Sequence, residues 1–415
     1  MTRNSEMSIT RIASKSLALS TADQVVSSAS NFLFLILLAT TLPVNDFARA
    51  STIWTVISFT VIMQRSVFGV PLLLDLDSQK TNQNNVSGAR FGSALAGIPA
   101  ILVAVVFFIE SSNSVYLLLA CLIPLILLQD LGRYVAISKE HPKIALFSDL
   151  LLLLPISLAI GLSLSNQNEL RANVALAAFG FGLIGATLVV FGTKVFDFSL
   201  KKLKVLLNED IQRRKKLFID SALISSTAIG SLALVWICYG STGVAAFNGS
   251  LTALAPIGLS TLVVQLVVQH GMVGSFGRVR FREAGIFLSL LMLGTLWIAI
   301  LVTAPPSIGS LFLGESWVLS EVLFMAMGFS LLAGLILEFL IVALRAQGSF
   351  DQIVTIRKLA ISALPIAYFG ALSSGLELDY ALIALGLWGL ALSAWVLLFL
   401  KPFSFGSILL DKSLK

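Results

Sequence analysis

The chain has 415 residues, of which 57% are hydrophobic and only 12% are charged, and its mean hydropathy is +0.94. A soluble globular domain carries roughly 25% charged residues, so this composition excludes an ordinary soluble protein and predicts a membrane protein. The formal charge of +6 is explained by basic cytoplasmic loops, and we expect no nucleic acid partner.

Apolar runs of about 18 residues or more recur along the whole chain, which predicts an all-α integral membrane protein with about 12 transmembrane helices. No removable signal peptide is expected, because the N-terminus lacks an early apolar core. We place the spans at residues 17–41, 51–74, 91–109, 114–136, 144–164, 173–192, 217–239, 244–269, 284–304, 318–344, 359–375 and 380–400.

The distribution of basic residues predicts that both termini are cytoplasmic. With the N-terminus inside, 25 of the 28 Lys and Arg residues fall on the cytoplasmic side. The outside loops hold only Arg49 and Arg171, and Arg65 lies within the second span. This asymmetry follows the positive-inside rule and supports an even number of spans. The outside loops are short, so we expect no external domain.

The longest internal loop divides the predicted spans into two groups of six, which we expect to form two lobes. The expected units are an N-terminal lobe at 1–192, a cytoplasmic amphipathic linker at 193–216 and a C-terminal lobe at 217–415. In the linker, apolar residues recur at helical spacing while lysines fill much of the opposite face. This pattern predicts a helix that lies on anionic membrane lipid, the alternative being a solvated linker. The apolar positions are Phe196, Leu200, Leu203, Leu207 and Ile211.

No motif of an enzyme is present, and we expect neither catalysis nor a cofactor. The chain lacks the GxxxxGK[ST] loop of nucleotide hydrolysis. Its two histidines, His141 and His270, have no neighbouring Cys or second His to suggest a metal site. The two cysteines, Cys121 and Cys238, lie in separate apolar runs and predict no disulfide framework.

Ionisable groups inside the spans are the most informative residues, since a charge there costs roughly 2.5–3.5 kcal/mol and usually faces a bundle interior or a wet cavity. All of them fall in the cytoplasmic half of the predicted topology. The alternative for Asp130, Arg133 and Asp220 is a side chain that reaches the surface from a helix end, and the first two are also spaced to pair with each other. The groups are Asp23, Arg65, Asp130, Arg133, Asp149, Asp220 and Glu338.

These groups suggest a charged vestibule that opens to the cytoplasm. We expect Arg65 to bind an anionic substrate, and the buried carboxylates to bind H⁺ or Na⁺. The first span is also rich in polar residues, which have a role in the cavity or in helix–helix hydrogen bonding. The predicted ion-coupling or polar cavity residues are Asp23, Gln24, Asn31, Asp149, Asp220 and Glu338.

Four stretches of the chain resemble the Wzx-type polysaccharide flippases of the multidrug/oligosaccharidyl-lipid/polysaccharide exporter superfamily. They are the polar first span DQVVSSASNFLFLILLATTL from Asp23 with the following NDFA, then RSVFGVPLLL from Arg65, GRYVAISKEHPKIALFSDL from Gly132 and LFLGESW from Leu311. The arrangement of six plus six spans is also similar.

The resemblance implies alternating access that moves an undecaprenyl-pyrophosphate-linked sugar unit from the inner to the outer leaflet of a bacterial inner membrane. It implies two six-helix lobes around a central cationic cavity, for which Arg65 and Arg133 are the candidates in this sequence. A lipid-linked oligosaccharide would be the partner, together with membrane lipids and a polysaccharide polymerase and chain-length proteins.

Other classes remain open from the sequence. Cation-coupled drug exporters of the same superfamily share the layout, whereas its lipid II flippases usually have two further spans. Major facilitator transporters also have six plus six spans, but their motif after the second span is missing from DLDSQKTNQNNVSGARFGS. A structural membrane protein is disfavoured by the buried charges.

Overall fold

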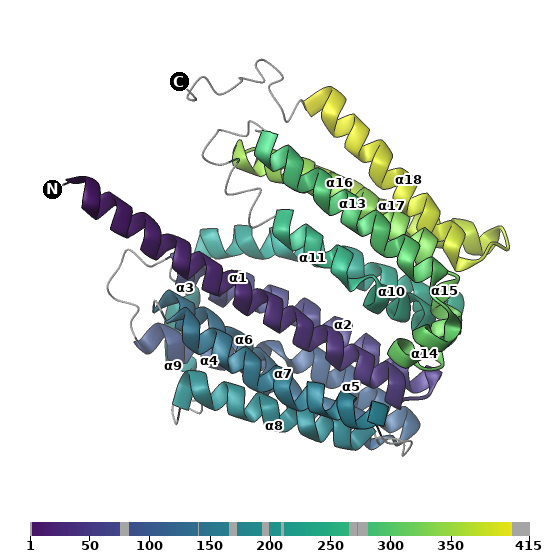
Figure 1. The fold of residues 1–415 in the computed structure, drawn as a ribbon, viewed down its shortest axis with the longest axis horizontal. Coiled ribbons are helices and arrows are strands. Elements are labelled where there is room, and N and C mark those ends of the chain that lie inside the picture. Colours follow the sequence, from purple (N-terminus) through teal and green to yellow (C-terminus); the bar gives the residue numbers. More distant parts are fainter. Residues whose placement is uncertain are drawn as a thin grey trace. The chain divides into compact units, whose positions relative to one another are not determined.

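The structure, a computed structural model, describes residues 2–74, 83–139, 141–165, 172–192, 199–208, 211–264, 272 and 281–400. The elements of these ranges are helices (Figure 1), and 11 of them are long and apolar enough to cross a membrane. The chain is therefore an all-α, multi-pass membrane protein. It forms two compact units, Met1–Ser225 and Ser226–Lys415.

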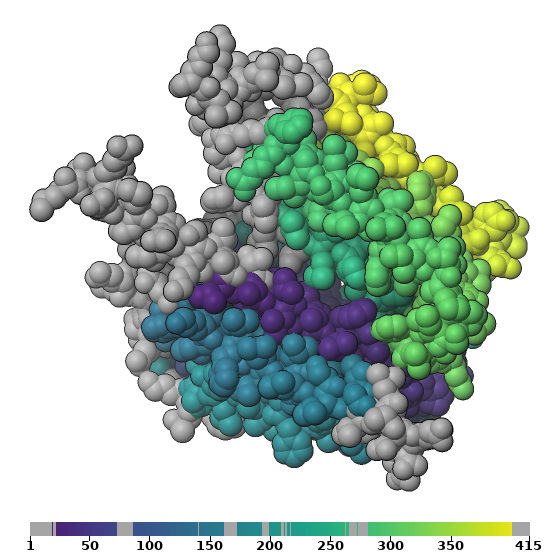
Figure 2. Space-filling model, viewed as in Figure 1, coloured from purple at the N-terminus to yellow at the C-terminus, as the bar shows by residue number. Residues whose placement is uncertain are grey.

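The first unit is built around four long helices, α1, α6, α7 and α8. Helix α7 contacts both α1 and α8, and α6 contacts α8. In the space-filling view, α1 lies along the face formed by α7 (Figure 2). The helices of this unit are α1 (Thr2–Thr41), α2 (Val44–Gln64), α3 (Val70–Leu74), α4 (Gln83–Ala96), α5 (Ile98–Ser111), α6 (Ser114–Ser138), α7 (Pro142–Ser165), α8 (Ala172–Phe191), α9 (Leu200–Asn208) and the first part of α10 (Ile211–Ala253).

The second span changes its helical geometry near its C-terminal end. The candidate span runs over Val44–Leu72, but residues Arg65–Gly69 form a π-helical turn between α2 and α3. The N–H of Val70 donates to the carbonyl of Arg65, which is the wide i to i+5 bond of this geometry. Pro71 explains the widening, because its ring would clash with the carbonyl four residues earlier in a regular α-helix.

The expected third span, 91–109, is two helices rather than one. Helix α4 ends at Ala96 and α5 begins at Ile98, with Gly97 between them. Proline is favoured in the first turn of a helix, where its missing N–H would have no partner, so Pro99 starts α5 and limits α4. Position 97 also has little space for a side chain, since a Cβ added to Gly97 would lie 2.9 Å from Ile123 Cγ2.

Part of the predicted linker is the short helix α9, which packs on α4. Leu203 and Leu206 are buried in a cluster with Phe68, Val86 and Ala89. Leu200 and Leu207, which were also expected on the apolar face, are exposed, and Phe196 lies outside the described residues. The helix therefore uses one apolar face to bind the protein and leaves other apolar side chains and Lys201 and Lys204 on the surface.

The second unit contains the remaining spans, and here the expected boundaries change. Its first helix, α10, is interrupted at Gly240, whose φ of 65° and ψ of −163° are not helical. This break lies between the expected seventh span, 217–239, and the expected eighth span, 244–269. The eighth span is itself divided at Leu254 between the end of α10 and α11, and its last residues lie outside the described ranges. The other helices are α11 (Ala255–Val263), α13 (Phe281–Thr303), α14 (Pro306–Leu313), α15 (Ser316–Glu321), α16 (Phe324–Ala346), α17 (Phe350–Ser373) and α18 (Leu378–Trp395).

The eleventh span is longer than the sequence pattern predicted. We expected residues 359–375, but α17 begins at Phe350. The prediction placed Arg357 and Lys358 in the cytoplasmic segment before this span. Arg357 instead forms an ion pair of 2.7 Å with Glu338 on α16, so its charge is compensated inside the helix bundle.

The contact between α4 and α9 depends on the absence of a side chain at Gly88. A Cβ there would lie 2.7 Å from the backbone carbonyl group of Lys202, which cannot move away as a side chain can. We therefore expect Gly88→Val to destabilise the first unit by roughly 1–3 kcal/mol through overpacking. Thermal denaturation of the purified protein in detergent measures this loss. The control is Gly185→Ala, which meets nothing within 4 Å; an equal fall in both variants would contradict the packing account.

Candidate functional site

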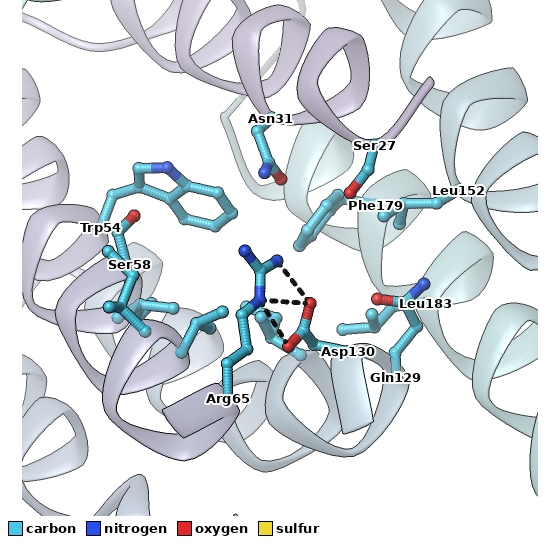
Figure 3. Close-up of a pocket in the computed structure, with 14 residues that line it drawn as sticks. Ser27, Asn31, Trp54, Ser58, Arg65, Gln129, Asp130, Leu152, Phe179 and Leu183 are labelled. Atoms are coloured by element: carbon cyan, nitrogen blue, oxygen red, sulfur yellow. Dashed lines mark hydrogen bonds and ion pairs between the residues drawn. The ribbon is translucent and has the colours of Figure 1, made fainter. Parts of the chain in front are cut away.

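A pocket of about 160 Å³ lies within the first unit, between α1, α2, α6, α7 and α8 (Figure 3). Helix α2 and the π-helical turn supply the largest share of its lining. Their lining residues follow helical spacing, so they share one face that points to the pocket. These residues are Trp54, Ile57, Ser58, Val61, Ile62 and Arg65.

Aromatic side chains form one part of the wall. Phe34 stacks on Phe179 with ring centroids 4.2 Å apart, and it contacts Trp54 at 4.7 Å. Phe34 and Phe179 are buried, while Trp54 and Phe179 line the pocket. Such offset and tilted aromatic contacts hold the rings in fixed positions. The pocket therefore has a rigid apolar side made from α1, α2 and α8.

The opposite part of the wall is an ion pair between Arg65 and Asp130. Arg65 Nη2 lies 2.6 Å from Asp130 Oδ1, and Arg65 Nε lies 3.0 Å from Oδ2, which gives a bidentate contact. The Arg65 side chain is 25% exposed, whereas that of Asp130 is 6% exposed. The guanidinium faces Trp54 and Asn31 across the pocket (Figure 3). Arg65 also lies over the Tyr134 ring, at 5.8 Å from its centroid.

Arg133 is the centre of a second, more deeply buried set of contacts. Its Nη2 donates to Asp23 Oδ2 at 2.7 Å, and its Nη1 donates to Ser27 Oγ at 2.8 Å. Its Nε lies 3.1 Å from Asp149 Oδ2, and its Nη1 lies 3.4 Å from Asp130 Oδ1. The side chain is only 3% exposed. One guanidinium thus connects α1, α6 and α7.

Neutral polar groups extend this arrangement to α8. Gln129 Nε2 donates to Asp149 Oδ1 at 2.7 Å and lies 3.2 Å from Ser148 Oγ. Ser148 Oγ in turn donates to the carbonyl of Ala186 on α8 at 3.1 Å. Asp149 is fully buried and is held from two sides, by Arg133 and by Gln129. The fixed geometry of the site therefore rests on contacts among four helices.

The charges of this ionic cluster, which we define as Asp23, Arg65, Asp130, Arg133 and Asp149, do not cancel. Two guanidinium groups face three carboxylates, which gives a formal charge of −1 when all are ionised. Each carboxylate contacts a guanidinium, but among the described side chains the cluster has one negative charge more than it has positive charges, which would favour one additional cation. Within the described ranges, no three His, Cys, Asp or Glu side chains are placed to hold a metal ion.

Most of the predicted site residues lie together in the first unit. Asp23, Arg65, Arg133 and Asp149 belong to the ionic cluster, Gln24 Oε1 lies 3.4 Å from Arg133 Nη2, and Asn31 lines the pocket. Two residues lie elsewhere. Asp220 is half-buried on α10 and does not line this pocket, and Glu338 pairs with Arg357 in the second unit. The roles assigned to all of these residues stay predictions.

The main partner of Asp130 and the uncharged residues of the pocket wall differ from the expectation or were not predicted. Asp130 was expected to pair with Arg133, and that contact is present, but its shorter contacts are with Arg65. Trp54 and Ser58 lie eleven and seven residues before Arg65, which are the spacings of one helical face. A search for polar and aromatic residues at those spacings would have found both. Phe179 had no such signal, because α8 is apolar on all sides.

Comparison with known proteins gives the fold. No family model matches the chain, and no curated protein matches it. Among solved structures, the lipid II flippase MurJ in an inward closed conformation has a TM-score of 0.67 and 14% identity, over 93% of this chain and 88% of that chain. A multidrug resistance MATE family transporter of the MOP superfamily, inward-facing, has a TM-score of 0.62 and 12% identity, over 92% and 97%.

A MOP superfamily transporter from Pyrococcus furiosus Vc1, whose binding pocket is described as reversed in polarity, has a TM-score of 0.56 and 13% identity, over 94% of each chain. Identities this low show the fold alone. The chain is thus an all-α integral membrane protein with the fold of MATE transporters and MurJ.

Removal of the Arg133 side chain tests the structural role of the ionic cluster. Arg133→Met leaves Asp23 and Asp149 without their cation, and we expect a loss of roughly 3–5 kcal/mol in stability. Thermal denaturation in detergent is the measurement. Arg49→Met is the matched control, because Arg49 pairs at 3.5 Å with Glu110, whose side chain is 56% exposed, and should cost less than about 1 kcal/mol. Similar losses in the two variants would contradict the account.

Proposed function

We propose that the chain is a transporter that moves a polyprenyl-pyrophosphate-linked oligosaccharide from the inner to the outer leaflet by alternating access. The observation that carries this proposal is the accessible guanidinium of Arg65 in a pocket that also offers amide and hydroxyl groups. Arginine is well suited to phosphate and to hydroxyl-rich ligands, because its donors form a fixed fork. The shared fold with a lipid II flippase is consistent with this substrate class.

The size of the pocket limits what it holds. Sites for drug-sized ligands have volumes of roughly 300–1,000 Å³, whereas this one measures about 160 Å³. It therefore suits one group of the substrate, such as a phosphate or a single sugar ring. Asp130 binds one edge of Arg65, and Asn31 and Trp54 lie across from the guanidinium (Figure 3). The remainder of the substrate would lie outside this pocket.

The excess negative charge of the ionic cluster supports coupling to H⁺ or Na⁺. One bound cation would bring the formal charge of the cluster from −1 to zero. Asp149 and Asp23 are the carboxylates best placed for this, because both contact the buried Arg133 rather than the accessible Arg65. Binding there would weaken the hold on Arg133 and so alter the packing of α1 and α7 against α6.

A second candidate is export of an organic cation, as in multidrug exporters of the same superfamily. The same formal charge of −1 and the aromatic side chains Trp54 and Phe179 favour it, because a cation binds well near an aromatic face in a negative site. The fold shared with MATE transporters is equally consistent with this function. The two candidates differ in the sign of the charge that Arg65 and Asp130 must attract.

The proposed location is a bacterial inner membrane with both termini in the cytoplasm. For a flippase, the partners would be membrane lipids, the lipid-linked oligosaccharide and the polymerase and chain-length proteins that use the flipped product. The inside placement of most basic residues supports this orientation.

A deletion strain separates the two functions, and substitution of Arg65 tests the site. We expect the deletion to give short surface polysaccharide and an accumulation of lipid-linked repeat units on the inner leaflet. Arg65→Ala should restore about a tenth or less of the flux, because a charge-assisted hydrogen bond contributes roughly 1.5–3 kcal/mol. Arg65→Lys should be intermediate.

The control for this experiment is Arg49→Ala, which removes a positive charge outside the pocket. Normal polysaccharide together with sensitivity to cationic drugs would favour the exporter over the flippase. Full complementation by Arg65→Ala would contradict the assigned role of Arg65 in either case.

A further inference from the structure

A backbone carbonyl beside the pocket has lost its regular helical donor. In an α-helix the carbonyl of Val67 would accept a hydrogen bond from the N–H of residue 71. That residue is Pro71, which has no N–H, and the turn ahead of it is the π-helical segment Arg65–Gly69. Pro71 therefore has two effects. It widens the turn that carries Arg65, and it leaves the Val67 carbonyl without the backbone N–H donor of residue 71.

The partner comes from the start of α10. Arg214 Nη1 donates a hydrogen bond to the carbonyl oxygen of Val67. Arg214 is only 7% exposed, although this residue lies three positions before the apolar span that begins at Leu217. An arginine at the end of a span usually extends to the water, so its burial against a backbone carbonyl indicates a specific role.

The packing of the linker brings Arg214 to this position. Helix α9, just before α10, lies so close to α4 that a Cβ at Gly92 would meet both Leu203 of the linker and Phe68 of the π-helical turn. Phe68, Leu72 and Leu203 also belong to one buried apolar cluster. The linker thus contacts the turn that carries Arg65 through an apolar side chain as well as through the Arg214 hydrogen bond.

We propose that Arg214 is a positioning residue for Arg65: it supplies the donor that Pro71 withholds, and it thereby holds the π-helical turn that directs Arg65 into the pocket. The same helix, α10, continues from Arg214 into the second unit. A movement of α10 during transport would therefore act directly on the turn beside the substrate group. This consequence rests on the proposed function, whereas the positioning itself does not.

A substrate-free measurement tests the proposal. Cys121 and Cys238 are replaced by Ser, and Ser58→Cys places a half-buried thiol in the pocket lining beside Arg65. The rates of reaction with a negatively charged and a positively charged methanethiosulfonate reagent are then compared. A nearby guanidinium favours the anionic reagent, so the ratio of the two rates reports where the Arg65 charge lies. Arg65→Gln gives the reference ratio for a pocket without this cation.

We expect Arg214→Met to lower the ratio about threefold or more, at least half of the way to the Arg65→Gln value on a logarithmic scale. Arg214→Lys, which keeps a donor, should retain most of it. Lys215→Met is the matched control: it removes the same charge from an exposed neighbour and should leave the ratio unchanged. Size-exclusion profiles in detergent identify any variant that fails to fold, and Arg214→Leu, which also lacks a donor, then replaces Arg214→Met.

The Pro71→Ala background makes the test specific. Alanine restores the N–H at position 71, so the same Arg214 substitution should change the ratio by less than about 1.5-fold there. An unchanged ratio in Arg214→Met, or an equal fall with and without Pro71, would overturn the proposal. If transport instead proves independent of Arg65 while these ratios behave as expected, the proposed function fails and the positioning role stands.

Discussion

The buried guanidinium of Arg133 is the contact on which the rest of the first unit depends. It binds carboxylates from α1, α6 and α7 within 3.4 Å, and it is almost completely withdrawn from solvent. Removal of one partner from such a group leaves an unpaired buried charge, so each of these helices is fixed to the others. Arg65 can remain partly accessible because its partner, Asp130, is held on the other side by Arg133.

Arg133 and Arg65 therefore have different environments, although the sequence predicted that both would be cations of the substrate cavity. Arg133 is enclosed by carboxylates and a serine hydroxyl, which directs its donors to the protein. Arg65 reaches the pocket across from Trp54 and Asn31 (Figure 3). An anionic group would meet only Arg65, and it would compete there with Asp130. Under the proposed function, this competition would let the binding of the substrate and the binding of a cation affect each other.

Much of the fold was predictable, because the cost of polar groups in lipid forces long apolar runs and leaves basic residues outside them. The class, the approximate spans and the members of the ionic cluster followed from that constraint. Boundaries failed where a charge is neutralised inside the bundle, as for Arg357 with Glu338, and the break at Gly97 inside the third span was missed. The break at Gly240 falls where the sequence pattern ended the seventh span.

The pairing of the site residues was not predictable in the same way. Asp23, Asp149 and Arg133 lie more than a hundred residues apart or on different helices, and only packing decides which carboxylate meets which guanidinium. The contact of Arg214 could not be predicted either, since Arg214 lies in a run of basic residues that is typical of an ordinary cytoplasmic segment. Its contact depends on Pro71, and that relation appears only when the π-helical turn is seen.

Transport by the purified protein in liposomes tests the central claim most directly. The full chain is reconstituted with a polyprenyl-pyrophosphate oligosaccharide that carries a label on its sugar, and an impermeant enzyme outside the vesicles reports how much sugar has crossed. The account predicts that sugar enclosed at the start becomes accessible with time, and that a cation gradient changes the rate. No transfer above that of protein-free vesicles, together with movement of a cationic dye, would contradict it.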